Sequence, residues 1–187
     1  MTKTAKNILI LSFLLTLINL VSKGLGFIRE MIFAYFYGLS KEYDIFLVSI
    51  TLSTIINSTI YYLSQNYFIP IYNNKSKAGE AEQNRFFAFS LVVFGIISVI
   101  IVSLLIIFRS NVLNLLLGTT SKLEYDLAEK IYLVFLFIIP INALFSIIAA
   151  FNQAKFSFLR ISISYVLTNI SIIVFIILFH NSLGILA

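Results

Sequence analysis

The sequence contains no cysteine and no tryptophan, and it contains one histidine. Without cysteine, this chain can form neither a disulfide nor a thiolate metal site, and thiol catalysis is excluded. His180 alone cannot build a metal centre, because a bound zinc ion needs at least three protein ligands. The remaining side chains do not supply a nucleophile together with a base and an orienting partner. We therefore expect no enzyme, no metal site and no cofactor.

Charged residues are also scarce. They make up 11% of the 187 residues, whereas an ordinary soluble domain has about a quarter. Hydrophobic residues make up 60%, and the mean hydropathy is +1.01. This composition is typical of a multi-spanning membrane protein. The net charge of +5 does not indicate nucleic-acid binding, because lysine and arginine mostly flank apolar runs, where they orient a chain in the bilayer.

Long apolar runs dominate the rest of the chain. A helix needs about 20 residues to cross about 30 Å of hydrocarbon, and only helices satisfy their own backbone groups without closing a barrel. We therefore predict an all-α fold, a membrane helical bundle with about five transmembrane helices in a single membrane domain, residues 1–187. The five predicted spans are residues 7–38, 43–72, 86–108, 128–151 and 159–179.

The distribution of lysine and arginine among the loops predicts the orientation of the chain. Basic residues before the first span and in the loops after the second and fourth spans outweigh those on the other side. By the positive-inside rule this side is cytoplasmic, which predicts a cytoplasmic N-terminus. Between the third and fourth spans, Ser121 and Glu124 have the spacing of a capping box, which predicts the start of a helix.

The first span contains three charges, because Lys23, Arg29 and Glu30 lie within eight positions. A charge near the bilayer centre costs about 2.5–3.5 kcal/mol on insertion scales, so these side chains must face protein, water or one another. One interpretation is a structural ion pair, or a lysine that snorkels to the interface. The other is a hydrated basic cavity that binds an anionic ligand. The composition of this span leaves both open.

The second span carries a polar stripe. Its members are Thr54, Asn57, Tyr61 and Gln65, which recur at helical spacing on an otherwise apolar segment. Such a stripe is typical of residues that line a cavity. Hydrogen bonding between helices explains any single member equally well.

The stretch VSKGLGFIREMIFAYFYGLSKEYDIFLVS resembles the opening of the MurJ/MviN lipid II flippases, members of the multidrug/oligosaccharidyl-lipid/polysaccharide exporter superfamily. The family pattern is approximately S-R-x-L-G-F-x-R-[DE], then an apolar stretch, then G-x-x-x-x-x-D-x-F. The matching residues are Ser22, Lys23, Leu25, Gly26, Phe27, Arg29, Glu30, Gly38, Asp44 and Phe46. Further similarity in SQNYFIPIY and FNQAKFSFLRISISYVLTNISII extends the resemblance over most of the chain.

This resemblance implies a transporter of the bacterial cytoplasmic (inner) membrane, which flips the undecaprenyl-pyrophosphate-linked peptidoglycan precursor lipid II in cell wall biogenesis. It also implies that Lys23 and Arg29 contact the pyrophosphate and that Glu30 pairs with one of them. Asp44 would lie at the periplasmic end of the second span. A guanidinium grips a phosphate with two hydrogen bonds, whereas Lys23, where the family has arginine, supplies charge without that fork.

Two departures from the family pattern keep other functions open. No basic residue lies between Lys41 and Lys75, where the family has one near the middle of the second span, and the sequence stops where the resemblance would have a sixth helix beginning. We therefore expect an incomplete N-terminal lobe. Its expected partners are a lipid II-like polyprenol-pyrophosphate-linked glycan, membrane lipids and a missing second lobe. The alternatives are a flippase for O-antigen or another polyprenol-linked glycan, and a non-transporting membrane fragment or scaffold.

Overall fold

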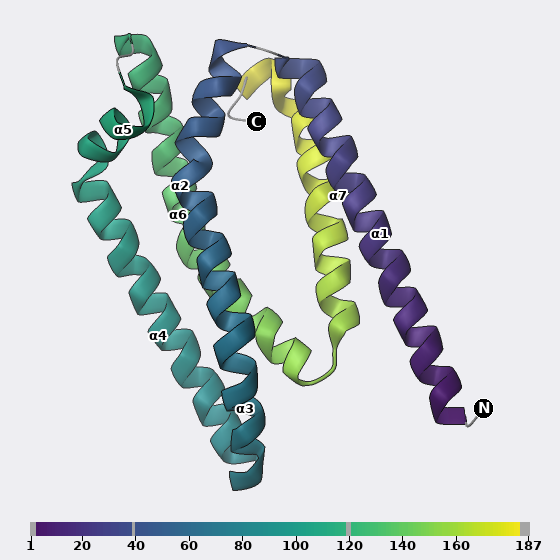
Figure 1. Cartoon of the computed structure of the whole chain (residues 1–187). Helices are drawn as coiled ribbons and strands as arrows, with labels where there is room; N and C mark the ends of the chain where they lie inside the picture. The colour runs from purple at the N-terminus through teal and green to yellow at the C-terminus, as the bar shows by residue number, and fades with distance from the viewer. Residues whose placement is uncertain (1–2, 39, 119–120, 184–187) are drawn as a thin grey trace. The chain divides into compact units, whose positions relative to one another are not determined.

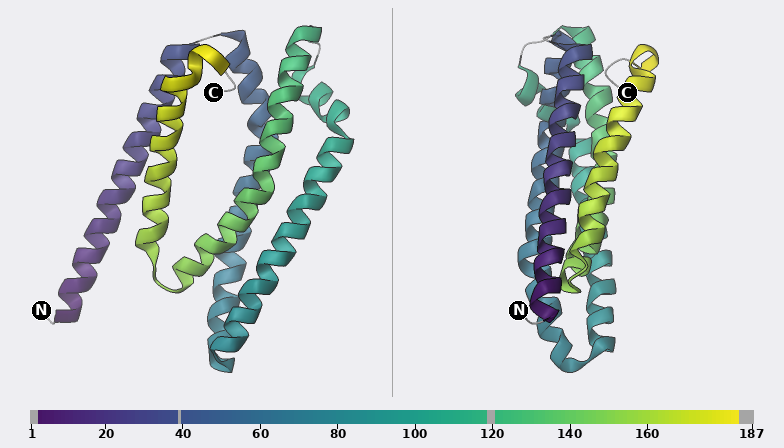
Figure 2. Two further views of the ribbon diagram at one scale, coloured as in Figure 1. Left: turned by 180° about the vertical axis from the view of Figure 1, so that it is seen from behind. Right: turned by 90° about the vertical axis from the view of Figure 1, so that its right-hand side faces the viewer.

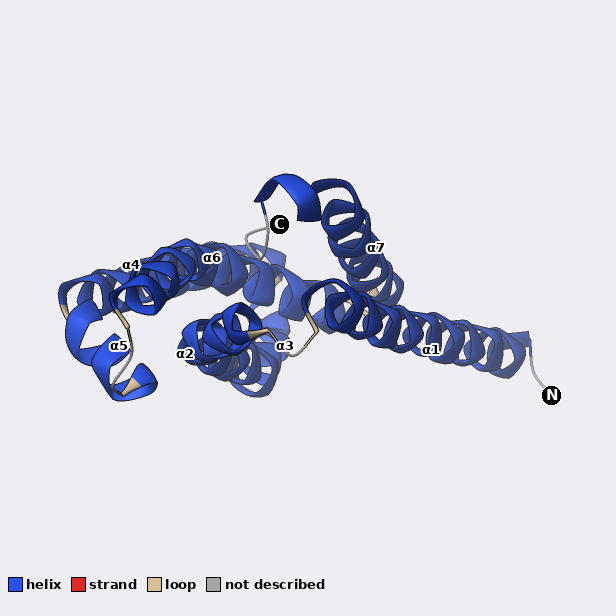
Figure 3. Cartoon of the chain, turned by 90° about the horizontal axis from the view of Figure 1, so that it is seen from above, coloured by secondary structure: helices blue, strands red, loops and turns tan. Residues whose placement is uncertain are grey.

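The computed structural model describes residues 3–38, 40–118 and 121–183. The described residues form helices joined by short turns and contain no strand (Figure 1, Figure 3). In chain order the helices are α1 (Lys3–Tyr37), α2 (Lys41–Leu63), the π-helical segment η1 (Ser64–Phe68), α3 (Ile69–Lys75), the 3-10 helix η2 (Ser76–Ala78), α4 (Glu80–Ile107), α5 (Arg109–Leu117), α6 (Lys122–Ala154) and α7 (Phe158–Leu183).

Five helical stretches in the described part of the chain are long and apolar enough to cross a bilayer, which confirms the predicted all-α membrane fold. The second stretch is the longest, at 38 residues. At a rise of 1.5 Å per residue it measures about 57 Å, well beyond the hydrocarbon thickness, so it must tilt or project from the membrane. The stretches are Ile10–Tyr37, Lys41–Ala78, Glu80–Ile107, Lys122–Ala154 and Phe158–His180.

The chain divides into two compact units. The first unit consists of α1 and α7, which lie side by side although they come from opposite ends of the sequence (Figure 2). The outer surfaces of both helices are apolar: Phe27 of α1 is 67% exposed and Leu178 of α7 is 67% exposed. Hydrocarbon is the solvent that suits such surfaces. Near one end of the pair, the rings of Phe36 and His180 lie 4.0 Å apart, centre to centre.

The second unit, Ser40–Lys155, is a bundle in which α6 packs against both α2 and α4. Side chains of α6 form its interior: Tyr132, Leu136 and Ile139 are all fully buried. Small residues of α6, among them Ala143 and Ala150, are also fully buried and let the neighbouring helices approach closely. A second cluster of stacked aromatic rings surrounds Phe68 and Tyr72 and includes Phe86, Phe87 and Phe151.

Polar contacts hold one end of the bundle. The Glu124 amide donates to the Ser121 hydroxyl at 3.4 Å, and the Ser121 amide donates to the Glu124 carboxylate at 3.0 Å, which confirms the predicted capping box. The same carboxylate forms an ion pair with Lys41 at the start of α2. Arg109 of α5 pairs with Glu129 of α6 at 2.6 Å. Three helices of the bundle are therefore joined at this end.

The second span is not one regular helix. Residues Ser64–Phe68 form a π-helical turn between α2 and α3. Pro70 lies within the first turn of α3 and has no backbone N–H, so the bond that this residue would donate in a regular helix is missing. A π turn contains one extra residue and rotates the next residues of the chain around the helix axis. The predicted polar stripe assumes regular α-helical spacing. That spacing ends at Leu63, so Gln65 lies in the π-helical turn, beyond the regular part of the stripe.

Candidate functional site

Arg29 lies on α1 with its side chain 30% exposed. Its Nη2 donates to Oε1 of Glu30 at 2.6 Å, and its Nε donates to the same oxygen at 3.2 Å. Adjacent residues of a helix point in different directions, so this pair forms only because both side chains are long. Two charges of the first span thus neutralise each other, while the Glu30 side chain is still 55% exposed.

Asn169 of α7 reaches the same guanidinium. Nη1 of Arg29 donates to Asn169 Oδ1 at 3.3 Å. The amide nitrogen of Asn169 donates to the Ser22 carbonyl at 3.2 Å and to the Tyr165 carbonyl at 3.1 Å, and the Ser22 hydroxyl lies 3.5 Å away. A nitrogen must face two carbonyl oxygens, so the network fixes the amide with its oxygen toward Arg29. We call Ser22, Arg29, Glu30 and Asn169 the polar joint.

The polar joint leaves part of the arginine available. A guanidinium has five N–H groups, and within the described residues three of them donate to Glu30 and Asn169. Two N–H groups remain. A pair of N–H groups on one guanidinium is the arrangement that binds phosphate and carboxylate oxygens at two points. The joint can therefore accept an anion without first breaking all of its own hydrogen bonds.

Lys23 lies outside the polar joint. It is exposed, and it has no ion-pair or hydrogen-bond partner among the residues that the structure describes. It is six residues before Arg29 on the continuous helix α1, which places the two side chains about 120° apart around the axis. Because Glu30 pairs with Arg29, Lys23 is a separate positive charge.

Asp44 lies in the first turn of α2, close to the N-cap residue Ser40, and is exposed. A carboxylate in the first turn of a helix is favoured by the partial positive charge of the unpaired backbone N–H groups. This position gives Asp44 a structural role in the second unit that needs no ligand.

The polar residues of the second span differ from one another. Thr54 is exposed, and its hydroxyl donates to the Ile50 carbonyl of its own helix at 3.0 Å. Asn57, Tyr61 and Gln65 are half-buried. Oδ1 of Asn57 and Nε2 of Gln65 are buried without a hydrogen-bond partner in the described part of the chain. Leaving a buried polar atom without a hydrogen-bond partner costs about 1–3 kcal/mol of stability. We therefore expect a water molecule or a ligand to bond to these two amides.

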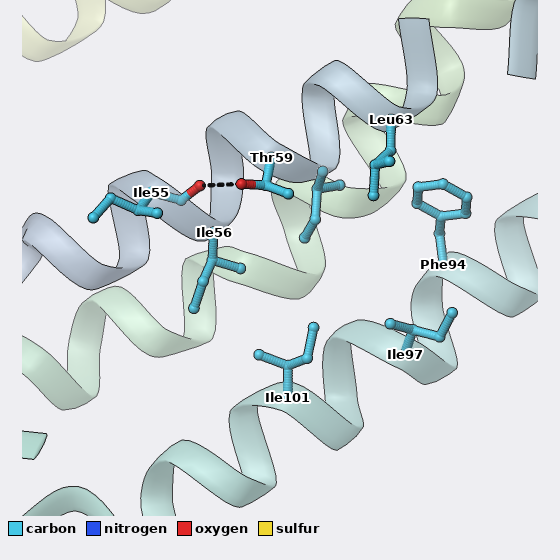
Figure 4. A pocket seen from close by; sticks show the side chains of 8 residues that line it. Ile55, Ile56, Thr59, Leu63, Phe94, Ile97 and Ile101 are labelled. Atoms are coloured by element: carbon cyan, nitrogen blue, oxygen red, sulfur yellow. Dashed lines mark hydrogen bonds between the residues drawn. The ribbon is translucent and has the colours of Figure 1, made fainter. Parts of the chain in front are cut away.

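An apolar cavity of about 240 Å³ lies between α2 and α4 of the second unit (Figure 4). Its one hydroxyl, on Thr59, already donates its hydrogen to the Ile55 carbonyl at 2.9 Å. The cavity suits hydrocarbon and does not suit a charged headgroup. The residues that line it are Ile55, Ile56, Thr59, Ile60, Leu63, Phe94, Ile97 and Ile101.

Comparison with known proteins decides the family. The lipid II flippase MurJ family matches residues 33–187, most of the chain. The chain belongs to the MurJ family. A lipid II flippase MurJ from Thermosipho africanus (strain TCF52B) is 29% identical over 175 residues, which cover 90% of this chain and 35% of the relative. The chain thus spans about a third of the length of this curated MurJ relative. No solved structure matches the chain.

Membership of the MurJ family confirms the resemblance seen in the sequence. The family match includes Asp44 and the polar residues of α2, and it begins after Glu30. The family match therefore does not include Lys23, Arg29 and Glu30. Any role for them is inferred from the sequence motif that contains them and from the geometry of the polar joint. Asn169 was missed by sequence reasoning. The available signal was the side-chain amide of Asn169 in the middle of an apolar span, but this signal does not identify Arg29 as its partner.

Proposed function

We propose that this chain is part of a lipid II flippase and that Arg29 binds the pyrophosphate of the undecaprenyl-linked precursor. Family membership supports the activity. The observation that carries the assignment to Arg29 is its half-buried guanidinium, which keeps two N–H groups without an acceptor among the described residues, in a mainly apolar span. A guanidinium in this setting is expensive to place in a membrane, and intramembrane charges mark substrate pathways.

The chemistry of the cargo requires such a group. A pyrophosphate cannot cross hydrocarbon without counter-charge, because the cost of an unpaired ion in a medium of low dielectric constant is very large. Arg29 supplies charge and two-point hydrogen bonding. Glu30 neutralises Arg29 before the ligand arrives and is displaced in part when the pyrophosphate competes for the same guanidinium. Lys23, which has no partner among the described residues, adds a point charge that the pyrophosphate attracts.

Asn57, Tyr61 and Gln65 belong to a second part of the proposal. Two of these three half-buried side chains hold a buried amide atom without a partner in the described part of the chain. We assign them to a hydrated surface of the α2–α6 unit, where water or a sugar hydroxyl completes their hydrogen bonds. Thr54 bonds to its own backbone and contributes less to this surface. Asp44 contributes a negative charge at the start of α2.

The proposed location is the bacterial inner membrane, with a cytoplasmic N-terminus. The basic residues around the turn after α3 support this orientation. In a full-length background without other cysteines, Lys122→Cys should react with an impermeant thiol reagent added outside, and Ser76→Cys should not. Both side chains are exposed, so access from one side of the membrane is the variable. The reverse labelling pattern would overturn the orientation.

The functional test is rescue of a strain depleted of its lipid II flippase by the full-length protein. Arg29→Ala should abolish rescue, because the charge and the two-point grip are both lost. Arg29→Lys should restore only part, because an ammonium has no planar fork. The matched control is Arg109→Ala, which also removes an arginine from a 2.6 Å ion pair but at the capped end of the bundle, and should rescue normally.

Rescue by Arg29→Ala at a normal membrane level would remove Arg29 from the proposed site. Loss of rescue by Arg109→Ala to the same extent would show that ion pairs in this protein matter for folding rather than for cargo. The quantity of each variant in the membrane is measured in parallel, so that poor insertion is separated from poor transport.

A further inference from the structure

Asn169 joins α7 to α1 at two points. It contacts Ser22 through its nitrogen and Arg29 through its oxygen, and these residues lie seven positions apart, about two helical turns. Both contacts fall within the first unit, whose two helices pack along each other (Figure 1). One amide thus connects the backbone of α1 with the charged end of a side chain on the same helix.

Hydrogen bonds fix the direction in which the amide of Asn169 faces. Its nitrogen donates to two carbonyl oxygens, at Ser22 and Tyr165, while its oxygen accepts from Arg29. A rotation by 180° would place an oxygen against two carbonyls and a nitrogen against a guanidinium, and all three hydrogen bonds would be lost. The oxygen is therefore a fixed acceptor, unlike the Glu30 carboxylate, whose side chain is 55% exposed.

Two anchors define the plane of a guanidinium better than one. Glu30 holds Nε and Nη2, and Asn169 holds Nη1 from the other helix. With only Glu30, the guanidinium would depend on a single side chain that is 55% exposed. With both, the two remaining N–H groups keep one direction before a ligand arrives, which lowers the entropic cost of binding.

We propose that Asn169 is a positioning residue that orients the guanidinium of Arg29 for two-point binding of a diphosphate headgroup. This inference rests on the proposed function of Arg29. The competing role for Asn169 is that of an interhelical hydrogen bond that only holds α1 to α7, as asparagine commonly does in membrane bundles. The two roles differ in one respect. Orientation matters for a planar fork and not for a spherical ammonium group.

A double-mutant cycle separates the two roles. The full-length protein in lipid nanodiscs is titrated with undecaprenyl pyrophosphate, and the four proteins are wild type, Asn169→Leu, Arg29→Lys and the double variant. Loss of one hydrogen bond to a charged group should weaken binding by about tenfold in the wild-type background. In the Arg29→Lys background the same change should weaken binding by less than about twofold, because the ammonium has no plane to orient.

Thr168→Val is the matched control on α7. The Thr168 hydroxyl donates at 2.9 Å to the Ser164 carbonyl of its own helix, so its removal takes a polar group from the neighbouring position without touching the polar joint. Binding should remain unchanged. If Asn169→Leu lowers the unfolding temperature, the experiment is repeated with Asn169→Ser. This substitution also removes the acceptor for Arg29, and the serine hydroxyl can bond to a carbonyl of its own helix.

The outcomes separate this inference from the function on which it rests. Equal weakening by Asn169→Leu in both backgrounds, together with a lower unfolding temperature, would assign Asn169 to interhelical packing and overturn the inference. Normal binding by Asn169→Leu and Asn169→Ser, with binding lost in Arg29→Ala, would also overturn it and leave the proposed function intact. Normal binding by Arg29→Ala would overturn the proposed function itself.

Discussion

The two units of this chain use different contacts to hold their helices together. In the α1–α7 pair, Asn169 connects the helices through hydrogen bonds to Ser22 and Arg29, and large apolar side chains such as Phe27 face outward. In the α2–α6 bundle, fully buried apolar side chains such as Leu136 and Ile139 fill the interior. Ion pairs and a capping box hold one end of this bundle.

The physics of the bilayer explains what this difference means. Lipid tails are as apolar as leucine, so close packing rather than the hydrophobic effect holds membrane helices together. The bundle has such packing along α6, so we expect it to tolerate the loss of a polar contact. The pair contains Lys23, Arg29 and Glu30 within a candidate membrane span, and the polar joint connects its two helices. We therefore expect stability to depend mainly on the bundle, and the ligand binding that we propose would fall mainly to the pair.

The largest expected effect is on the stability of the bundle. Ile139→Ala should lower the free energy of unfolding by about 2–5 kcal/mol, because the loss of the buried side chain leaves a cavity. Ile141→Ala on the same helix, where the side chain is 66% exposed, and Ile28→Ala on α1 should change it by less than about 0.5 kcal/mol. Unfolding is followed by thermal denaturation in one detergent. Equal effects for all three would contradict the assignment of stability to the bundle.

A smaller effect with the opposite sign is expected at Asn57. Asn57→Leu replaces an amide whose oxygen is buried without a partner among the described residues, so the free energy of unfolding should stay the same or rise by about 1 kcal/mol. Rescue of the depleted strain should fall, because the hydrated surface loses a polar group. Thr54→Val, which removes a hydroxyl that bonds to its own backbone, is the control and should change rescue less. A destabilised Asn57→Leu with normal rescue would make Asn57 a structural residue.

Much of the fold could be predicted from local sequence. Apolar runs of sufficient length identify membrane helices without any knowledge of their neighbours, and the spacing of Ser121 and Glu124 identifies the start of α6. Both signals are local, because backbone hydrogen bonds and helix caps involve residues a few positions apart. The π turn at Ser64–Phe68 was not predicted, although Pro70 was a visible signal for an interrupted helix.

The geometry of the charged site could be predicted only in part. The sequence singles out Lys23, Arg29 and Glu30, and the resemblance implies that Glu30 pairs with one of the two basic residues without deciding which. In the structure Glu30 pairs with Arg29. The contact between Arg29 and Asn169 joins residues 140 positions apart. No local pattern reveals such a contact.

The central claim is that Arg29 faces water and ligand rather than lipid or a dry interior. Its most direct test is chemical labelling of Arg29→Cys in a full-length background without other cysteines, with a charged, membrane-impermeant thiol reagent that has access to both faces of the membrane. Phe27→Cys, whose parent side chain is 67% exposed on the apolar surface of the same helix, is the control. We predict that Arg29→Cys reacts and that Phe27→Cys does not. An Arg29→Cys variant as unreactive as Phe27→Cys would contradict the claim and would favour a membrane scaffold with a structural ion pair.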